Sequence, residues 1–191
     1  VDTVEQERQG IVSTTKENVV VRRWWVEQPM SPGSATYSYV HSNGKIGVLI
    51  TLLAPSADAA KDSAFRELGD DLAMQIAAMG PLAISPDRLD PVEVERQKNI
   101  FETQLTELKK PQAAWPKILE GKFNKWHTET CLLNQESVVH AKTSIAQVIK
   151  NVGVKLGGDV TVVNFIRCQV GEGIEKAKEN LADEVAKMIK E

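Results

Sequence analysis

Residues 36–54 constrain the fold of this chain more than any other stretch. Two runs rich in apolar residues, TYSYVH and KIGVLITLLA, are separated there by Ser42, Asn43 and Gly44. An Asn-Gly pair adopts positive φ readily and is typical of tight turns between antiparallel strands. The pattern therefore predicts a β-hairpin with His41 at its turn.

Two further segments have the composition of strands. NVVVRRWWV (Asn18–Val26) and DVTVVNFIRCQV (residues 159–170) are dense in β-branched and aromatic residues, which favour a pleated surface. EQPMSPGS, between the first segment and the hairpin, contains two prolines and a glycine and is predicted to be a loop. A weak similarity between KENVVVRRWWV and GGDVTVVNFIR suggests two duplicated subdomains.

The remaining chain shows helical periodicity. Apolar residues recur every three or four positions within residues 56–79, which predicts an amphipathic helix. Asp90 and Pro91 have the features of an N-cap and a first helical residue, and they open a helix predicted to end near Leu108. A second apolar stripe, over residues 115–126, completes a helical hairpin. Further helices are expected around residues 2–12, from 143 to 152 and over the C-terminal residues from 174.

Charge and composition narrow the classes of partner. The net charge of −3, from 23 basic and 26 acidic residues, gives no attraction to nucleic acid or to an anionic membrane. Every apolar stretch is far shorter than the roughly 20 residues needed to span a bilayer, and the acidic N-terminus lacks the pattern of a secretory leader. The two cysteines are far apart, as expected in a reducing compartment.

The residues that carry chemistry are too scattered to predict an enzyme. His41, His127 and His140 lie in three different segments without a metal-binding spacing, so we expect no metal site. The glycine pairs near residues 157 and 171 lack the surroundings of a nucleotide-binding loop, so we expect no cofactor. Cys131 is either a nucleophile or a buried core residue, and its apolar surroundings favour burial.

Trp24 and Trp25, next to Arg22 and Arg23, allow two interpretations. They form a basic aromatic surface for single-stranded nucleic acid, or they lie on one strand that buries alternate side chains and therefore one tryptophan. The second interpretation is favoured, since one alternating strand accounts for the same residues and the net charge gives no sign of a polyanionic partner.

Several longer runs resemble the elongation factor Ts family. They occur in that family's order, and the resemblance extends from about Glu5 to the C-terminus. The runs are ENVVVRR, SYVHSNGKIGVL, LAMQIAAMGP, LEGKFNKW, CLLNQ and FIRCQVGEGIE.

The resemblance implies a fold and its divisions. The fold is an α+β core of two related subdomains, small antiparallel sheets packed with helices, with a helical hairpin insertion and a C-terminal helix. The first subdomain is expected at residues 1–84 and the second at 85–170, including the hairpin at about 91–128. The C-terminal module is expected at 171–191.

The resemblance also implies a function and a partner. The family binds elongation factor Tu, the GTPase that delivers aminoacyl-tRNA, and speeds its release of GDP, so the chain is expected to be the core of a guanine-nucleotide exchange factor and not an enzyme. The alternative is a binding or scaffold fragment without full exchange activity. The sequence does not decide whether the chain forms a homodimer. We expect a cytoplasmic protein, with a mitochondrion or plastid as the alternative.

Residues of the partner-binding site follow from the same resemblance. In the family a histidine on the first subdomain's hairpin enters the partner's G domain, and His41 matches it, with Ser42, Asn43 and Gly44 in the same turn. The alternative for His41 is a solvent-facing turn residue without a partner.

An apolar contact from the preceding loop accompanies that histidine in the family. The loop usually reads KIGEN, but this chain has TTKEN, with Thr15 in place of isoleucine and Lys16 in place of glycine. The resemblance therefore implies a weaker contact at these two positions. The family's N-terminal ubiquitin-associated-like domain and its TDFV motif have no counterpart in these 191 residues, so we expect a truncated chain.

Overall fold

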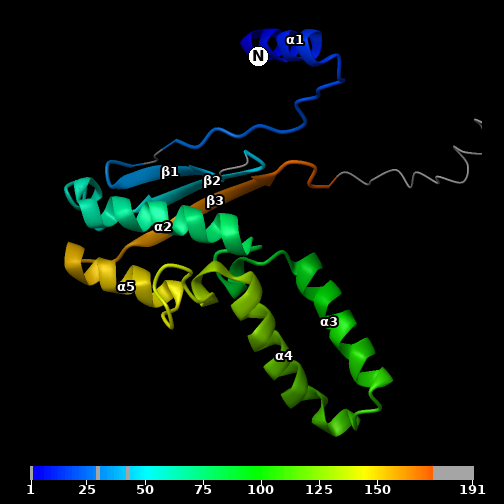
Figure 1. Cartoon of the computed structure of the whole chain (residues 1–191). Coiled ribbons are helices and arrows are strands. Elements are labelled where there is room, and N and C mark those ends of the chain that lie inside the picture. Colours follow the sequence, from blue (N-terminus) through cyan, green and yellow to red (C-terminus); the bar gives the residue numbers. More distant parts are fainter. Residues whose placement is uncertain (1, 29–30, 42–43, 174–191) are drawn as a thin grey trace, which may run out of the picture.

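The predicted hairpin forms two strands of a three-stranded antiparallel sheet, and its second strand is the central one (Figure 1). A computed structural model describes residues 2–28, 31–41 and 44–173. Strand β1 (Ser34–Val40) pairs with β2 (Ile46–Leu53), and β3 (Thr161–Gln169) pairs with the other edge of β2. Gly44 has φ +68°, as its place in a tight turn requires. Ser42 and Asn43 lie outside the described residues.

The strand predicted over Asn18–Val26 is wrong. These residues belong to a linker, residues 16–33, that joins α1 (Asp2–Thr15) to β1 without forming a strand in its described part. The side chains of Trp24 and Trp25 are 72% and 42% exposed, so the predicted burial of one tryptophan is also wrong. Strand propensity reflects packing on a pleated, half-buried surface, and the described residues of this segment pair with neither open edge of the sheet.

The helices cover one face of the sheet. In Figure 1, α2 (Ser63–Met79) and α5 (Ile145–Leu156) lie on the same side of the sheet, while α1 lies on the other. Asp62 caps the N-terminus of helix α2: its carboxylate accepts a hydrogen bond from the Ala64 amide at 2.8 Å. Gly80, which has a left-handed φ of +55°, caps the C-terminus.

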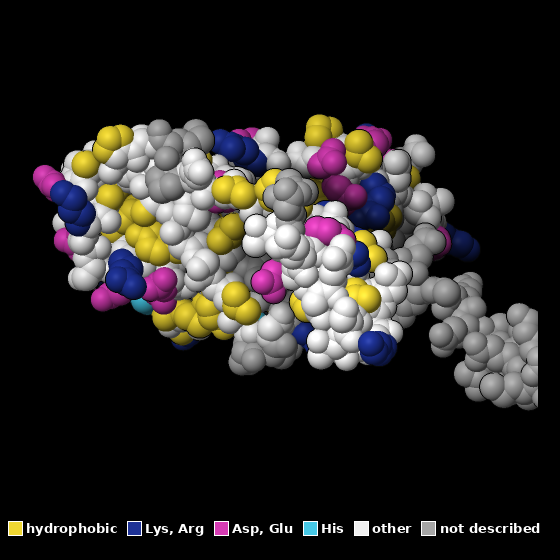
Figure 2. Space-filling view, turned by 90° about the horizontal axis from the view of Figure 1, so that it is seen from above, with side chains coloured by type: hydrophobic (Ala, Val, Ile, Leu, Met, Phe, Trp, Pro, Cys, Tyr) yellow, Lys and Arg dark blue, Asp and Glu magenta, His cyan; other side chains and the backbone are white. Residues whose placement is uncertain are grey.

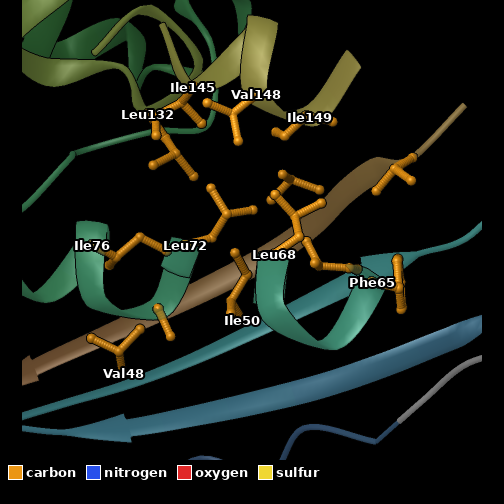
Figure 3. Packing of buried hydrophobic residues seen from close by; sticks show 14 of the residues in the cluster. Val48, Ile50, Phe65, Leu68, Leu72, Ile76, Leu132, Ile145, Val148 and Ile149 are labelled. Atoms are coloured by element: carbon orange, nitrogen blue, oxygen red, sulfur yellow. The ribbon is translucent and has the colours of Figure 1, made fainter. Parts of the chain in front are cut away.

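The main core lies between these two helices and the sheet (Figure 3). Alternate residues of a strand share one face, and residues three or four apart share one face of a helix. The central strand β2 and both helices therefore each contribute a continuous apolar set. The core side chains labelled in Figure 3 are Val48, Ile50, Phe65, Leu68, Leu72, Ile76, Leu132, Ile145, Val148 and Ile149.

The predicted helical hairpin is confirmed. It consists of α3 (Pro91–Glu107) and α4 (Trp115–Thr130), and it projects away from the sheet (Figure 1). The Asp90 carboxylate accepts a hydrogen bond from the Val92 amide at 2.9 Å, as its predicted N-cap role requires. The hairpin has its own small core at its base, separate from the main one, formed by Ala83, Leu89, Phe101, Trp126 and Cys131.

The expected α+β class is confirmed, with one sheet among the described residues. The division into subdomains at residues 1–84 and 85–170 stays a prediction. Strand β3, which lies in the predicted second subdomain, pairs with β2, which lies in the predicted first subdomain. The predicted C-terminal helix begins at residue 174, and residues 174–191 lie outside the described part of the chain. Within the described part, the helices are too short or too polar to cross a membrane.

Candidate partner-binding site

His41 directly follows β1, and hydrogen bonds hold its backbone on both sides. Its amide donates to the Ile46 carbonyl at 2.9 Å, and its carbonyl accepts from the Gly44 amide at 2.7 Å. The side chain is exposed. The structure therefore brings His41 and Gly44 together in one turn, and it presents the imidazole on a short, well-paired hairpin.

Tyr39 contacts the imidazole of His41. The Tyr39 hydroxyl lies 3.3 Å from Nδ1 of His41, and the two ring centroids are 6.2 Å apart. Tyr39 is half-buried and packs against the main core. Among the described residues, Nε2 of His41 has no hydrogen-bond partner. One ring nitrogen is thus held from within the chain, and the other is available to a partner protein.

Arg167 places a positive charge on the same face of the sheet. Val48 pairs with Tyr39 on one side and with Arg167 on the other, so these residues form one row across the three strands. The Arg167 guanidinium lies beside Gly80, at the C-terminus of α2, where a cation is favoured by the helix dipole. It also donates to Oε1 of Gln169 at 3.1 Å.

The linker approaches the hairpin turn from the opposite face of the sheet. A shallow groove of about 450 Å³ lies here, bordered by linker residues 20–23 and 25, by residues 44, 45 and 47 of the hairpin, and by residues 168–171 at and just beyond the end of β3. Arg22 donates to the carbonyl of Glu172, and Arg23 lies 3.8 Å from the Glu172 carboxylate. These contacts attach the linker to the end of the sheet.

Basic and aromatic side chains of the linker also contact each other. The Arg23 guanidinium lies 5.5 Å from the centre of the Trp25 ring, in a cation–π contact. On the face of the molecule seen in Figure 2, basic and acidic side chains are interspersed, and hydrophobic side chains gather in several groups. The expected absence of a nucleic-acid partner stays a prediction.

Thr15 and Lys16 lie at the C-terminus of α1, away from the hairpin turn (Figure 1). The Thr15 hydroxyl donates to the Ile11 carbonyl at 3.0 Å. Lys16 has a left-handed φ of +59°, a conformation that glycine adopts at little cost. This backbone requirement accounts for the glycine of the KIGEN pattern at that position. The role of both residues in partner binding stays a prediction.

Sequence reasoning missed Tyr39, Arg167 and Gln169. One signal in the sequence pointed to Tyr39: it lies two positions before His41 on a predicted strand, and residues two apart on a strand share a face. Arg167 and Gln169 reach this face through the pairing of β3 with β2. That pairing joins residues far apart in the chain, which the sequence pattern does not specify.

Other reactive side chains are not arranged for catalysis. In the described part of the chain, no three His, Cys, Asp or Glu side chains are placed to hold a metal ion together. Burial lowers the pKa of His127 below its ordinary value, and His140 lies 3.3 Å from the Asp71 carboxylate. His127 therefore belongs to the hairpin base, and His140 to a surface contact with Asp71.

Cys131 is fully buried, as expected, and burial raises the pKa of its thiol. We predict that a maleimide labels Cys168, which is half-buried, at least tenfold faster than Cys131 in the folded chain, because the thiolate is the reactive form and Cys131 is shielded. Mass spectrometry of a Cys168→Ser variant checks this. That variant should take up label only in urea, and rapid labelling without urea would contradict the burial of Cys131.

The amino-acid sequence of this chain is similar to those of known proteins of one family. The family model described as elongation factor TS matches residues 1–172. The elongation factor Ts of Caulobacter vibrioides is 37% identical over 195 residues, which cover 98% of this chain and 60% of that protein. That of Syntrophotalea carbinolica is 37% identical over 188 residues, with 98% and 60% covered. That of Lawsonia intracellularis is 37% identical over 163 residues, with 84% and 55% covered.

The match spans nearly the whole of this chain but only part of each relative. The chain covers about 60% of the length of the relatives from Caulobacter and Syntrophotalea. The residues that the family model matches include the β1–β2 hairpin and the α3–α4 hairpin of this chain. The chain belongs to the elongation factor Ts family.

Proposed function

We propose that this chain binds elongation factor Tu and promotes the release of GDP from it, as the core of a guanine-nucleotide exchange factor. The observation that carries the proposal is an exposed histidine, His41, on a hairpin whose backbone is hydrogen-bonded on both sides of that residue. Membership of the elongation factor Ts family supplies the identity of the partner. Nucleotide is bound by the GTPase, so this chain needs no cofactor of its own.

Exchange of this kind is a difference between two affinities. A factor shifts the GTPase away from its GDP-bound state only if it binds the nucleotide-free state more tightly. A rigid hairpin suits this task, because little conformational entropy is lost when it inserts beside the nucleotide site. The residues proposed to make this contact are His41 with Ser42, Asn43 and Gly44, and Thr15 with Lys16 is proposed to contribute a second contact.

The cellular setting of the proposal follows from its relatives. The three relatives described above come from bacteria. We place this chain in the cytoplasm with the translation machinery, and a mitochondrion or plastid is the alternative. Neither nucleic acid nor a membrane is part of the proposed complex.

We predict that His41→Ala lowers the acceleration of GDP release about tenfold, because the inserted imidazole is lost while the hairpin remains. The measurement is stopped-flow release of fluorescent GDP from elongation factor Tu, with and without the chain. His140→Ala is the matched control, since His140 is also exposed but pairs with Asp71 on α2. An equal loss of acceleration in the two variants would show that His41 has no special role in GDP release.

Binding is measured separately, by gel filtration with nucleotide-free elongation factor Tu. A complex without faster GDP release is the result that the scaffold alternative requires. If no complex forms and release is unchanged, the proposed function is wrong in both forms.

A further inference from the structure

We propose that Tyr39 is a positioning residue for His41: it holds the imidazole in the tautomer that carries its proton on Nε2, so that the hairpin offers a hydrogen-bond donor to an acceptor oxygen of the partner. The role in GDP release rests on the proposed function. The tautomer itself is a property of the free chain and is measured without any partner.

Tyr39 is suited to this role because the core holds its ring. It is half-buried, packs against the main core and lies opposite Val48 of the central strand, which is 3% exposed. The ring therefore has little freedom to turn away from its neighbours. Its hydroxyl projects toward the exposed end of the hairpin, where His41 begins the turn.

A hydrogen bond donated by the Tyr39 phenol selects one tautomer. A neutral imidazole has one nitrogen that donates and one that accepts, and the hydrogen bond of one nitrogen determines the state of the other. The Tyr39 hydroxyl lies 3.3 Å from Nδ1, a long hydrogen-bonding distance that a closer approach of the two side chains would shorten. When the phenol donates its hydrogen to Nδ1, that nitrogen carries no proton, and the proton of the ring lies on Nε2.

The geometry also specifies what the partner must offer. Both the His41 amide and its carbonyl are already used by Ile46 and Gly44, so the ring is the polar group that remains for a partner. With a proton on Nε2, the complementary group is an acceptor, such as a main-chain carbonyl or a carboxylate or phosphate oxygen. Holding the ring in advance lowers the entropy lost when the contact forms.

The first test uses the free chain. Long-range ¹H–¹⁵N spectra recorded near pH ~8, where imidazoles are largely neutral, distinguish protonated from bare ring nitrogens. We expect His41 to show a bare Nδ1 and a protonated Nε2. In Tyr39→Phe both nitrogens should shift toward the values of a free histidine side chain, while the backbone spectrum stays native.

Tyr37→Phe is the matched control for that test. Tyr37 lies on the same strand and the same face, but its ring packs edge-on against Phe65 at 6.0 Å and does not contact a histidine. This variant should leave His41 unchanged. An averaged tautomer in the unmodified chain, or an identical His41 in Tyr39→Phe, would overturn the proposal.

The second test asks whether the tautomer matters for GDP release. Tyr39→Phe should reduce the acceleration by roughly fivefold, the effect of losing about one hydrogen bond. The same substitution in a His41→Ala chain should have no further effect, because Tyr39 acts only through His41. Equal losses in both backgrounds would overturn the positioning role. Failure of the unmodified chain to accelerate release would refute the proposed function, and the spectra would still decide the tautomer.

Discussion

Replacing Gln75 by leucine is expected to lower the free energy of unfolding by about 3 kcal/mol, because the substitution leaves one buried and two partly buried polar groups without their partners. Gln75 and Gln135 are both 0% exposed. The Gln75 side-chain amide donates to Oε1 of Gln135 and to the Glu136 carbonyl, each at 3.1 Å, and its Oε1 accepts from the Val138 amide at 2.8 Å.

This network connects α2 to the chain that leaves the helical hairpin. Gln135 in turn donates from its Nε2 to the Glu129 carbonyl, near the end of α4, at 2.9 Å. A leucine fills a similar volume but satisfies none of these groups, and a partly satisfied buried network is less stable than a complete one. The loss should therefore exceed that of a substitution on the surface.

Urea denaturation followed by circular dichroism measures the effect. The matched control is Gln147→Leu, the same substitution on α5 at an exposed position where the amide bonds only to Asn151. It should change stability by less than about 0.5 kcal/mol. If the two variants unfold at the same urea concentration, water or a rearranged loop satisfies the groups around Gln75 and the network is not structural.

Gly69→Ala is expected to destabilise the chain by about 2 kcal/mol, although alanine is normally the better helix former. A Cβ atom built at Gly69 would lie 2.3 Å from a ring carbon of Tyr37, far inside van der Waals contact. The Tyr37 ring is itself held against Phe65. Glycine here allows α2 to approach β1 closely, and an added methyl group must displace the ring.

Gly121→Ala in α4 is the control of opposite sign. Nothing lies within 4 Å of a Cβ atom built at Gly121, so alanine should stabilise the helix by about 1 kcal/mol. Thermal or urea unfolding of both variants gives the comparison. Stabilisation in both would mean that the Tyr37 ring moves aside at no cost, and that close packing at Gly69 does not require glycine.

Local patterns were the reliable part of the prediction from sequence. The β1–β2 hairpin followed from an Asn-Gly pair between two apolar runs, and α3 began where Asp90 and Pro91 predicted. Turn chemistry and helix capping act over a few residues, so these elements depend little on the rest of the fold. The candidate site was predictable to the same extent, because His41 lies within such a turn.

The sequence by itself determined helices α1 to α5, the β1–β2 hairpin and the exposed place of His41 beside it. Only the tertiary structure decided that residues 18–26 form no strand: among the described residues the outer edges of β1 and β3 are open, but this segment pairs with neither of them, and strand propensity has an effect only where a segment packs on a pleated surface. It also decided that Arg167 joins the row of Tyr39, since the register of β3 on β2 places it there. Such pairings depend on packing between residues far apart in the chain, which local propensity does not encode.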